Sequence, residues 1–300
     1  MKTNNNTSQT VAIVGGTLWG NRGAEAMLAT TIGRIREKSP NTQFKVFSYY
    51  PQRDRELCTD PKIEFFDYRP LTLALRIVPL TMICYLFQSL RIRLPDWAVG
   101  RQISAIRDAD LLCDIGGITF CDGREIFLLY NVLSLFPALV LGIPVVKLSQ
   151  ALGPFRGPLN RFFAKLVLGA CQQVFPRGEV SAQHLSELPL PIHQWRPACD
   201  IALLYEDKYS LSNENPSRLS ELESVVEQRS SQATKTIAIV PSSLVMKKSP
   251  HYINSLVELS QGLIARGYHI LLLPNATRQG SGKLRNNDLA AIAAIVAQLN

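Results

Sequence analysis

Apolar stretches alternate with amphipathic ones from residue 10 onward. The run TVAIVGG (10–16) is short and apolar and ends in glycines, which predicts a buried strand. Residues 24–40 carry apolar positions at helical spacing and end at Pro40, which predicts a helix. The alternating, aromatic-containing QFKVFSYY (43–50) predicts the next strand. A strand, a helix and a strand in this order are typical of a parallel α/β sheet.

The same alternation continues to about residue 205. We expect helices at 101–109, 126–142 and 159–171, and strands at 110–117, 143–154 and from 172. Residues 196–205 are expected to close the sheet region. The pattern therefore predicts an N-terminal α/β domain over residues 10–205.

Residues 206–235 are polar and rich in serine, which predicts a connection between domains. A second alternation follows, with strands expected at 236–243 and 268–276 and helices at 250–267 and 286–300. Two strands and two helices bury too little apolar surface for a stable doubly wound domain. We therefore expect residues 236–300 to be the start of an incomplete domain, in a fragment or in a naturally truncated protein.

The stretch LTLALRIVPLTMICYLF (71–87) is strongly apolar but is interrupted by Arg76 and Pro79. A membrane span needs about 20 largely uncharged residues, which disfavours a span here. A buried helical hairpin is the favoured interpretation, and a peripheral membrane contact through residues 71–93 is the second. The flanking arginines that would lie near lipid phosphates are Arg69, Arg91, Arg93 and Arg101.

Composition narrows the possible partners. Lysine and arginine exceed aspartate and glutamate by 32 − 24 = 8, which suits anionic substrates, an anionic membrane surface or nucleic acid. The chain shows no RNA-binding motif, zinc spacing or long basic block, so we expect no nucleic-acid partner. The four histidines share no metal-ligand spacing, so neither a metal nor a cofactor is expected.

The six cysteines are scattered singly, and the N-terminal residues lack the apolar core of a signal peptide. This pattern is typical of reduced thiols in a cytoplasmic protein. We expect a cytoplasmic location, or a peripheral one at the inner membrane face.

The stretch WGNRGAEAML (19–28) follows the first predicted strand, where ligands bind in open α/β sheets. Gly20 and Gly23 permit close backbone approach, Asn21 can cap the next helix, and Arg22 can pair with an anion. Glu25 falls in the first helical turn, where a negative charge is favourable. A packing turn and a substrate-binding cradle are equally compatible with these residues.

The stretch DIGGITFCDG (114–123) ends another predicted strand. Gly116 and Gly117 can admit a ligand to the backbone, and Asp122 is the candidate catalytic carboxylate. The alternative is that the glycines serve close packing and that Asp122 caps a helix. We favour the functional interpretation because this is the second strand end lined by glycines.

Two further strand ends carry polar side chains. Gln150 lies in SQALGPFRG (149–157), and Arg177 and Ser181 lie in PRGEVSAQHL (176–185). An arginine there suits bidentate recognition of a carboxylate or phosphate, although a lone arginine is more often a solvated surface charge. Strand ends of one parallel sheet meet at one edge, so together these residues predict a substrate-binding cleft.

Four stretches, in this order, resemble the polysaccharide pyruvyl transferase family. WGNRGAEAML is similar to its N-x-G-x-E-A-x-L segment, DIGGITFCD to its GG…D element, KLSQALGP to its Q-x-x-GP loop and RGEVSAQHL to its R-D-x-x-S segment. The start of the second domain, IAIVPSS…LLLPN, is also similar.

The resemblance implies an α/β fold with two Rossmann-like domains in a GT-B-like arrangement, the second of them incomplete here. It implies transfer of pyruvate from phosphoenolpyruvate onto a pair of sugar hydroxyls, as a ketal, in surface polysaccharide biosynthesis. The implied partners are phosphoenolpyruvate and a sugar or lipid-linked saccharide acceptor. Arg177 matches the family's arginine and is the candidate for binding the donor.

Two departures from the family pattern leave alternatives open. Gly178 stands where the family usually has Asp, and the family's late R-x-H segment would fall after residue 300. A chain that ends there is expected to be unable to catalyse the reaction, whereas a longer protein would be competent. The alternatives are a GT-B-type nucleotide-sugar glycosyltransferase and a truncated, non-catalytic binding protein.

Overall fold

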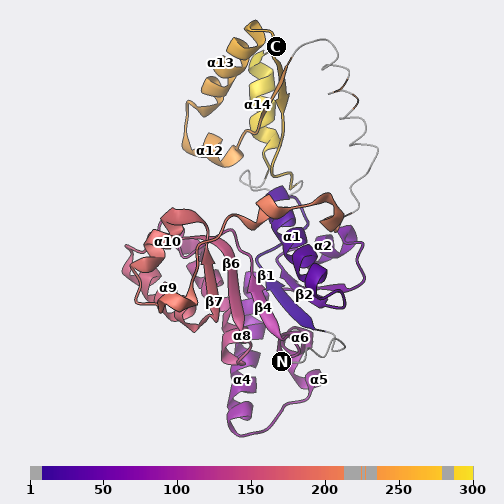
Figure 1. Cartoon of the computed structure of the whole chain (residues 1–300), viewed down its shortest axis with the longest axis vertical. Helices are drawn as coiled ribbons and strands as arrows, with labels where there is room; N and C mark the ends of the chain where they lie inside the picture. The colour runs from indigo at the N-terminus through magenta and orange to yellow at the C-terminus, as the bar shows by residue number, and fades with distance from the viewer. Residues whose placement is uncertain (1–8, 213–223, 225–226, 228–234, 279–286, 300) are drawn as a thin grey trace. The chain divides into compact units, whose positions relative to one another are not determined.

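The computed structural model describes residues 9–212, 224, 227, 235–278 and 287–299. Contacts divide the chain into two compact units. Unit 1 holds the residues before Trp19 together with Ala24–Leu211, and unit 2 holds Trp19–Gly23 together with the residues from Ser212 onward. Each unit is built on parallel strands with helices packed beside them (Figure 1).

The described strands of unit 1 form one sheet in which every pair of neighbours is parallel. Its order is β3-β2-β1-β4-β6-β5, with β7 also pairing with β6. The strands are β1 (Thr10–Val14), β2 (Gln43–Ser48), β3 (Ile63–Asp67), β4 (Leu111–Asp114), β5 (Ile118–Thr119), β6 (Val145–Leu152) and β7 (Gln173–Pro176). Because the chain builds outward from β1 to β3 and then returns to place β4 on the other side of β1, the sheet has its topological switch point between β1 and β4.

The helices of unit 1 cover both faces of this sheet. They are α1 (Arg22–Lys38), α2 (Pro51–Leu57), α3 (Pro70–Thr72), a π-helical turn (Leu73–Ile77), α4 (Val78–Ser89), α5 (Asp96–Val99), α6 (Arg101–Arg107), α7 (Leu128–Leu133), α8 (Phe136–Val140), α9 (Pro158–Ala170) and α10 (Gly178–Ser186). Short 3₁₀ turns lie at Glu125–Phe127, Ile192–Gln194, Ile201–Leu204 and Asp207–Tyr209.

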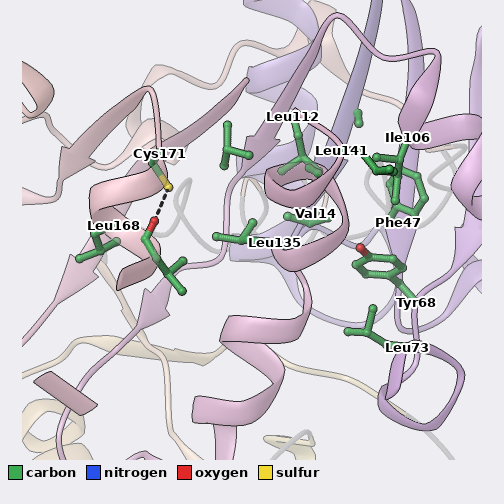
Figure 2. Packing of buried hydrophobic residues seen from close by; sticks show 14 of the residues in the cluster. Val14, Phe47, Tyr68, Leu73, Ile106, Leu112, Leu135, Leu141, Leu168 and Cys171 are labelled. Atoms are coloured by element: carbon green, nitrogen blue, oxygen red, sulfur yellow. Dashed lines mark hydrogen bonds between the residues drawn. The ribbon is translucent and has the colours of Figure 1, made fainter. Parts of the chain in front are cut away.

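Two buried clusters show why β1 is apolar throughout. Side chains alternate along a strand, and Ala12 and Val14 pack into one cluster while Val11 and Ile13 pack into the other. Both faces of the strand are therefore covered, as expected for a parallel sheet. Figure 2 shows part of the larger cluster, in which the Cys171 thiol donates a hydrogen bond of 3.2 Å to the carbonyl oxygen of Val167.

The structure corrects several sequence predictions. The helix expected at 126–142 is broken between α7 and α8, where Pro137 in the first turn of α8 lacks the N–H that a continuous helix would need. Residues 196–205 form no strand, but isolated bridges join Trp195 to Val174 of β7 and Ala198 to Arg177, the residue after β7. The elements α2 and β3 were not predicted.

The predicted connection begins inside unit 1. Tyr209 and Leu211 are 5% and 6% exposed and pack into the cluster that contains α1. The ring of Tyr209 occupies the space beside Gly33, where an added Cβ would lie 2.2 Å from Cδ1 of the ring. Most of the remaining predicted connection lies outside the described residues.

The apolar stretch 71–87 is not a hairpin. Residues Pro70–Ser89 form one continuous helix of 20 residues, made of α3, the π-helical turn and α4. In a regular α-helix the ring of Pro79 would clash with the carbonyl of Leu75, and the wider π turn just before Pro79 lets the helix continue. Among the described residues this is the one helix long and apolar enough to cross a membrane.

Unit 2 contains a parallel pair of strands and three described helices. They are β8 (Thr236–Ile239), α12 (Ser243–Lys248), α13 (Tyr252–Ala265), β9 (His269–Leu272) and α14 (Leu289–Leu299). Ile253 and Val257 of α13 pack against Ala291 and Ile295 of α14. Asp288 holds the loop after β8, because its Oδ1 accepts a hydrogen bond of 2.9 Å from the backbone N–H of Ser243.

Candidate functional site

Glycines bring the loops after β1 and β4 together at the topological switch point. Gly15 has a φ of +86°, and a Cβ there would lie 2.5 Å from the backbone nitrogen of Gly116. Only glycine fits this close approach and this conformation without strain. The Gly116 N–H also donates a 2.9 Å hydrogen bond to Oδ1 of Asp114, the last residue of β4. Backbone groups therefore line the place where open α/β sheets bind ligands.

A buried ion pair connects β4 to β6. Lys147 is fully buried, and its Nζ forms an ion pair with Oδ2 of Asp114, whose side chain is only 6% exposed. The Lys147 ammonium also lies 5.3 Å from the centroid of the Phe120 ring, a distance compatible with a cation–π contact. Lys147 was not predicted from the sequence, although it is a single charged residue inside the apolar run VVKL.

Gln150 links the loop after β4 to the neighbouring strands. Its side chain is fully buried, and Nε2 donates a hydrogen bond of 2.8 Å to the carbonyl oxygen of Asp114. Its Oε1 accepts a hydrogen bond of 2.5 Å from the hydroxyl of Thr119. These contacts use both ends of the amide, so the geometry gives Gln150 the role of positioning the Gly116–Gly117 loop.

Arg177 lies where β7 passes into α10 and joins the same group of residues. Its backbone N–H donates to the carbonyl oxygen of Gln150 at 2.8 Å, and its Nη2 donates to the carbonyl oxygen of Gly117 at 2.8 Å. Its Nη1 forms an ion pair with Oδ2 of Asp200. The guanidinium is half-buried, so it is fixed in direction while remaining in reach of solvent. The structure thus brings together Gly116, Gly117, Gln150 and Arg177, which the sequence placed at one sheet edge.

Two buried serines at the same edge of the sheet form hydrogen bonds with neighbouring backbone. The Ser181 hydroxyl, predicted to bind substrate, is buried and accepts a hydrogen bond of 3.2 Å from the backbone N–H of Leu152. Ser149 donates its hydroxyl hydrogen to the carbonyl oxygen of Cys199 and accepts a 2.9 Å hydrogen bond from the N–H of Ile201. Both hydroxyls hold neighbouring backbone in place.

Asp122 lies in the loop between β5 and α7 and ties it to the start of α9. Its Oδ2 accepts hydrogen bonds from the backbone N–H groups of Arg156 at 2.7 Å and Gly157 at 3.2 Å, and its Oδ1 accepts one from Asn160 at 2.8 Å. Desolvation acts to raise the pKa of Asp122, but the hydrogen bonds from Asn160 and the two N–H groups outweigh it and lower the pKa below its ordinary value. The carboxylate is therefore ionised at neutral pH.

The stretch Trp19–Gly23 belongs to unit 2. Asn21 forms an antiparallel bridge with Ala276, and the N–H of Arg22 donates to the carbonyl oxygen of Asn275 at 3.3 Å. Gly20 has a φ of +62°, and a Cβ there would lie 2.4 Å from Cγ of Arg278. The predicted site residues thus fall into two groups, with Gly20, Asn21, Arg22 and Gly23 in unit 2 and the remainder, Glu25 included, in unit 1.

A buried carboxylate that sequence analysis missed shapes the loop after β1. Asp54 of α2 is fully buried, and its Oδ1 accepts hydrogen bonds from the Thr17 hydroxyl at 2.7 Å and from the Leu18 N–H at 2.9 Å. Its Oδ2 accepts a hydrogen bond from the Ser48 hydroxyl. Within the described part of the chain, no cluster of three or more His, Cys, Asp or Glu side chains is arranged to hold a metal ion.

Comparison with known proteins assigns the chain to a family. The model of the polysaccharide pyruvyl transferase family matches residues 21–295. The chain belongs to this family. The resemblance carried by the strand-end motifs is confirmed, and the family is one of transferases in polysaccharide biosynthesis. No curated protein matches the chain.

Two solved structures, with UDP and UDP-GlcNAc in their descriptions, resemble the chain, and the first of them supports the fold. The S. aureus MnaA–UDP co-structure is 12% identical with a TM-score of 0.51, over 96% of this chain and 66% of that chain. The UDP-GlcNAc 2-epimerase from Neisseria meningitidis bound to UDP-GlcNAc is 14% identical with a TM-score of 0.48, over 97% of this chain and 70% of that chain. The α/β, GT-B-like fold class of this transferase family member is confirmed. The chain spans about two thirds of the length of these structures.

Proposed function

We propose that this protein transfers pyruvate from phosphoenolpyruvate onto two hydroxyls of a sugar or lipid-linked saccharide, forming a ketal in surface polysaccharide biosynthesis. The family match over residues 21–295 carries the proposal. The cluster of Arg177 with the Gly116–Gly117 loop at the carboxyl edge of the sheet supports it. We further propose the cytoplasm as the compartment, on the scattered cysteines of the sequence.

Phosphoenolpyruvate presents two anionic groups, a carboxylate and a phosphate, and a guanidinium matches either one with paired hydrogen bonds. Within the part of the chain that the structure describes, the Arg177 guanidinium donates one N–H to the Asp200 carboxylate and one to the Gly117 carbonyl oxygen. A guanidinium has further N–H donors, and these are what we assign to the donor. Helix α10 begins at the next residue, Gly178, and its N-terminal dipole favours the same negative charge.

In the proposed reaction, a proton adds to C3 of the enol, one sugar hydroxyl oxygen bonds to C2, and that hydroxyl loses its own proton, so the addition is neutral overall. The second hydroxyl oxygen then displaces phosphate from C2, and its proton leaves with the phosphate. Asp122 is the proposed catalytic carboxylate. Because it is ionised at neutral pH, we assign it the acceptance of a proton from a sugar hydroxyl and not the protonation of C3.

Donor binding is tested without knowing the acceptor. Phosphoenolpyruvate is expected to raise the thermal midpoint of the protein, and Arg177→Ala is expected to abolish this protection. Arg196→Ala is the matched control, because Arg196 is an exposed arginine on the segment that runs beside β7. Protection by phosphoenolpyruvate that survives in Arg177→Ala would contradict the assignment.

Turnover is tested with a panel of sugar acceptors by following phosphate release. The wild-type protein is expected to release phosphate only when an acceptor is present, and Arg177→Ala is expected to lose about a hundredfold or more in kcat/KM for the donor, as for other preorganised charged contacts. Protection by uridine diphosphate together with none by phosphoenolpyruvate would favour the glycosyltransferase alternative instead.

A further inference from the structure

The helix Pro70–Ser89 is apolar on the side that faces away from unit 1. A surface helix of a soluble protein normally presents polar side chains there. Leu71 and Leu75 are 74% and 75% exposed, and Leu86 and Leu90 are 59% and 70% exposed. With Pro79 and Met82 they recur at intervals of three or four residues, so they form one stripe. We call this stripe and the following residues up to Trp97 the α4 surface.

The opposite side of the same helix is fixed in the core of unit 1. Leu73 and Ile77 are fully buried, and Cys84 is 6% exposed, and all three belong to the larger apolar cluster. Thr81 is also fully buried, and its hydroxyl donates to the carbonyl oxygen of Ile77 at 2.7 Å. A helix that crossed a bilayer would have to leave this cluster. The helix is therefore placed to lie along a surface and not to span a membrane.

The charges around the stripe are mostly positive, and the acidic residue that follows, Asp96, forms an ion pair with Arg107 at 3.6 Å. Residues 70–95 contain Arg76, Arg91 and Arg93 and no acidic residue. Arg91 and Arg93 are exposed, and no described acidic side chain forms an ion pair with either. Together with Arg107 they line a cavity of about 350 Å³ whose other walls include Ile92, Leu94 and Ile143. An anionic group and a short apolar chain would both find matching chemistry there.

The end of this helix projects from the rest of unit 1. In Figure 1, α4 extends beyond the strands, and the chain turns there before α5. Trp97, in α5, is 87% exposed. Tryptophan prefers the boundary between lipid and water, because its ring is apolar and its N–H is polar. The stripe, the arginines and the tryptophan follow one another along the sequence 71–97.

We propose that the α4 surface docks onto an anionic lipid bilayer, with the helix in the plane of the interface and Arg91 and Arg93 on lipid phosphates. The bilayer is favoured over a second copy of the chain because a symmetric contact through this surface would bring Arg91 and Arg93 against their own copies, and the acidic residue of the surface, Asp96, already pairs with Arg107. The proposal concerns membrane docking and does not depend on which reaction the protein catalyses.

Vesicle flotation tests the proposal on the whole protein without substrate. The protein is expected to float with vesicles of phosphatidylcholine containing 30% phosphatidylglycerol and to remain unbound with pure phosphatidylcholine. Each basic residue near an anionic surface contributes about 1 kcal/mol, or about fivefold in binding. Arg91→Gln/Arg93→Gln is therefore expected to weaken binding roughly 25-fold, whereas Lys247→Gln/Lys248→Gln, with the same loss of charge at exposed lysines, leaves it unchanged.

The apolar contribution has its own matched pair of variants. Leu75→Gln/Leu86→Gln/Leu90→Gln removes the stripe and is expected to lower vesicle binding by roughly a thousandfold or more, since each of the three leucine side chains loses its burial in the bilayer. The control is Leu159→Gln/Phe162→Gln/Leu166→Gln on α9, because these side chains are 60%, 61% and 58% exposed. All six positions are exposed, so both variants are expected to fold, which circular dichroism checks.

The depth to which the α4 surface enters the bilayer is measured with the fluorescence of Trp97. Brominated lipids are expected to quench the wild-type protein on anionic vesicles, and Trp97→Phe is expected to lose this quenching while still floating with the vesicles. Equal flotation of the α4 triple variant and the wild type would overturn the proposal. So would a concentration-dependent dimer in light scattering that only the α4 triple variant breaks, because it would assign the surface to a second copy of the chain.

Discussion

Lys147→Met tests whether the buried ion pair holds the strand-end loops in place. Methionine resembles lysine in length, so the substitution removes the ammonium and little else. In wild type, Lys147 is fully buried and pairs with Asp114, whose other carboxylate oxygen accepts the N–H of Gly116. Without the lysine, a carboxylate remains in the interior with only the hydrogen bond from Gly116 among the described residues. We expect the free energy of unfolding of unit 1 to fall.

The expected loss in the free energy of unfolding follows from the burial of this ion pair. Breaking one partner of a buried ion pair typically costs about 3–5 kcal/mol, because the remaining charge has lost its compensation. For a unit of about 200 residues, each kcal/mol lowers the thermal midpoint by roughly 2–4 °C. We therefore expect a decrease of about 10 °C. Adding Asp114→Asn to Lys147→Met removes the orphaned charge, so the double variant is expected to recover part of the loss.

Urea unfolding followed by the fluorescence of Trp195 measures this change, since Trp195 packs against the larger cluster of unit 1. Trp19→Phe/Trp97→Phe provides the background in which Trp195 is the remaining tryptophan. The control is Lys165→Met on α9, an exposed lysine with no ion pair among the described residues. A loss below about 1 kcal/mol for Lys147→Met, or a double variant less stable than the sum of the two single changes, would refute the reasoning.

Two further substitutions test other parts of the site. Asp122→Asn is expected to lower the free energy of unfolding by about 1–3 kcal/mol at pH 7, because the hydrogen bonds to its carboxylate weaken. The pKa of Asp122 is lowered in the folded protein, so this stabilisation is present above the unfolded pKa of about 3.9 and is lost as the pH falls through the folded pKa. The urea midpoints of variant and wild type should therefore converge in acid, and a constant gap between them would contradict the reasoning. Gly15→Ala is expected to displace the Gly116 loop and abolish thermal protection by phosphoenolpyruvate, because Gly15 has a φ of +86° and an added Cβ would lie 2.5 Å from the Gly116 nitrogen. Gly142→Ala is the control and should retain this protection, since Gly142 has a comparable φ of +77° but nothing lies within 4 Å of its Cβ. Thermal protection in both variants would refute the role of the close approach.

The sequence predicted those parts of the site that depend on strand ends. Val11 to Val14 form an apolar run because both faces of β1 are covered, and that run is visible without a structure. Since the carboxyl ends of parallel strands share an edge, the grouping of Gly117 and Arg177 also followed from the pattern.

Residues that act through tertiary contacts were not predicted. Lys147 reads as a polar interruption of a strand until Asp114 is found beside it in the fold. The pairing of Asn21 with Ala276 joins segments far apart in the chain, and nothing local in WGNRG indicates it. The continuous helix at Pro70–Ser89 was hidden by Pro79, because local rules place a break there and only the π turn relieves the clash.

The ion pair between Lys147 and Asp114 also bears on how this sequence can diverge. Either residue changed alone leaves an isolated charge in the interior, so a path from the charged pair to an apolar pair passes through an unstable intermediate. The two positions therefore behave as one inherited unit. Among related chains we expect lysine and aspartate to be kept together or replaced together, and this joint variation would mark the pair in sequences alone.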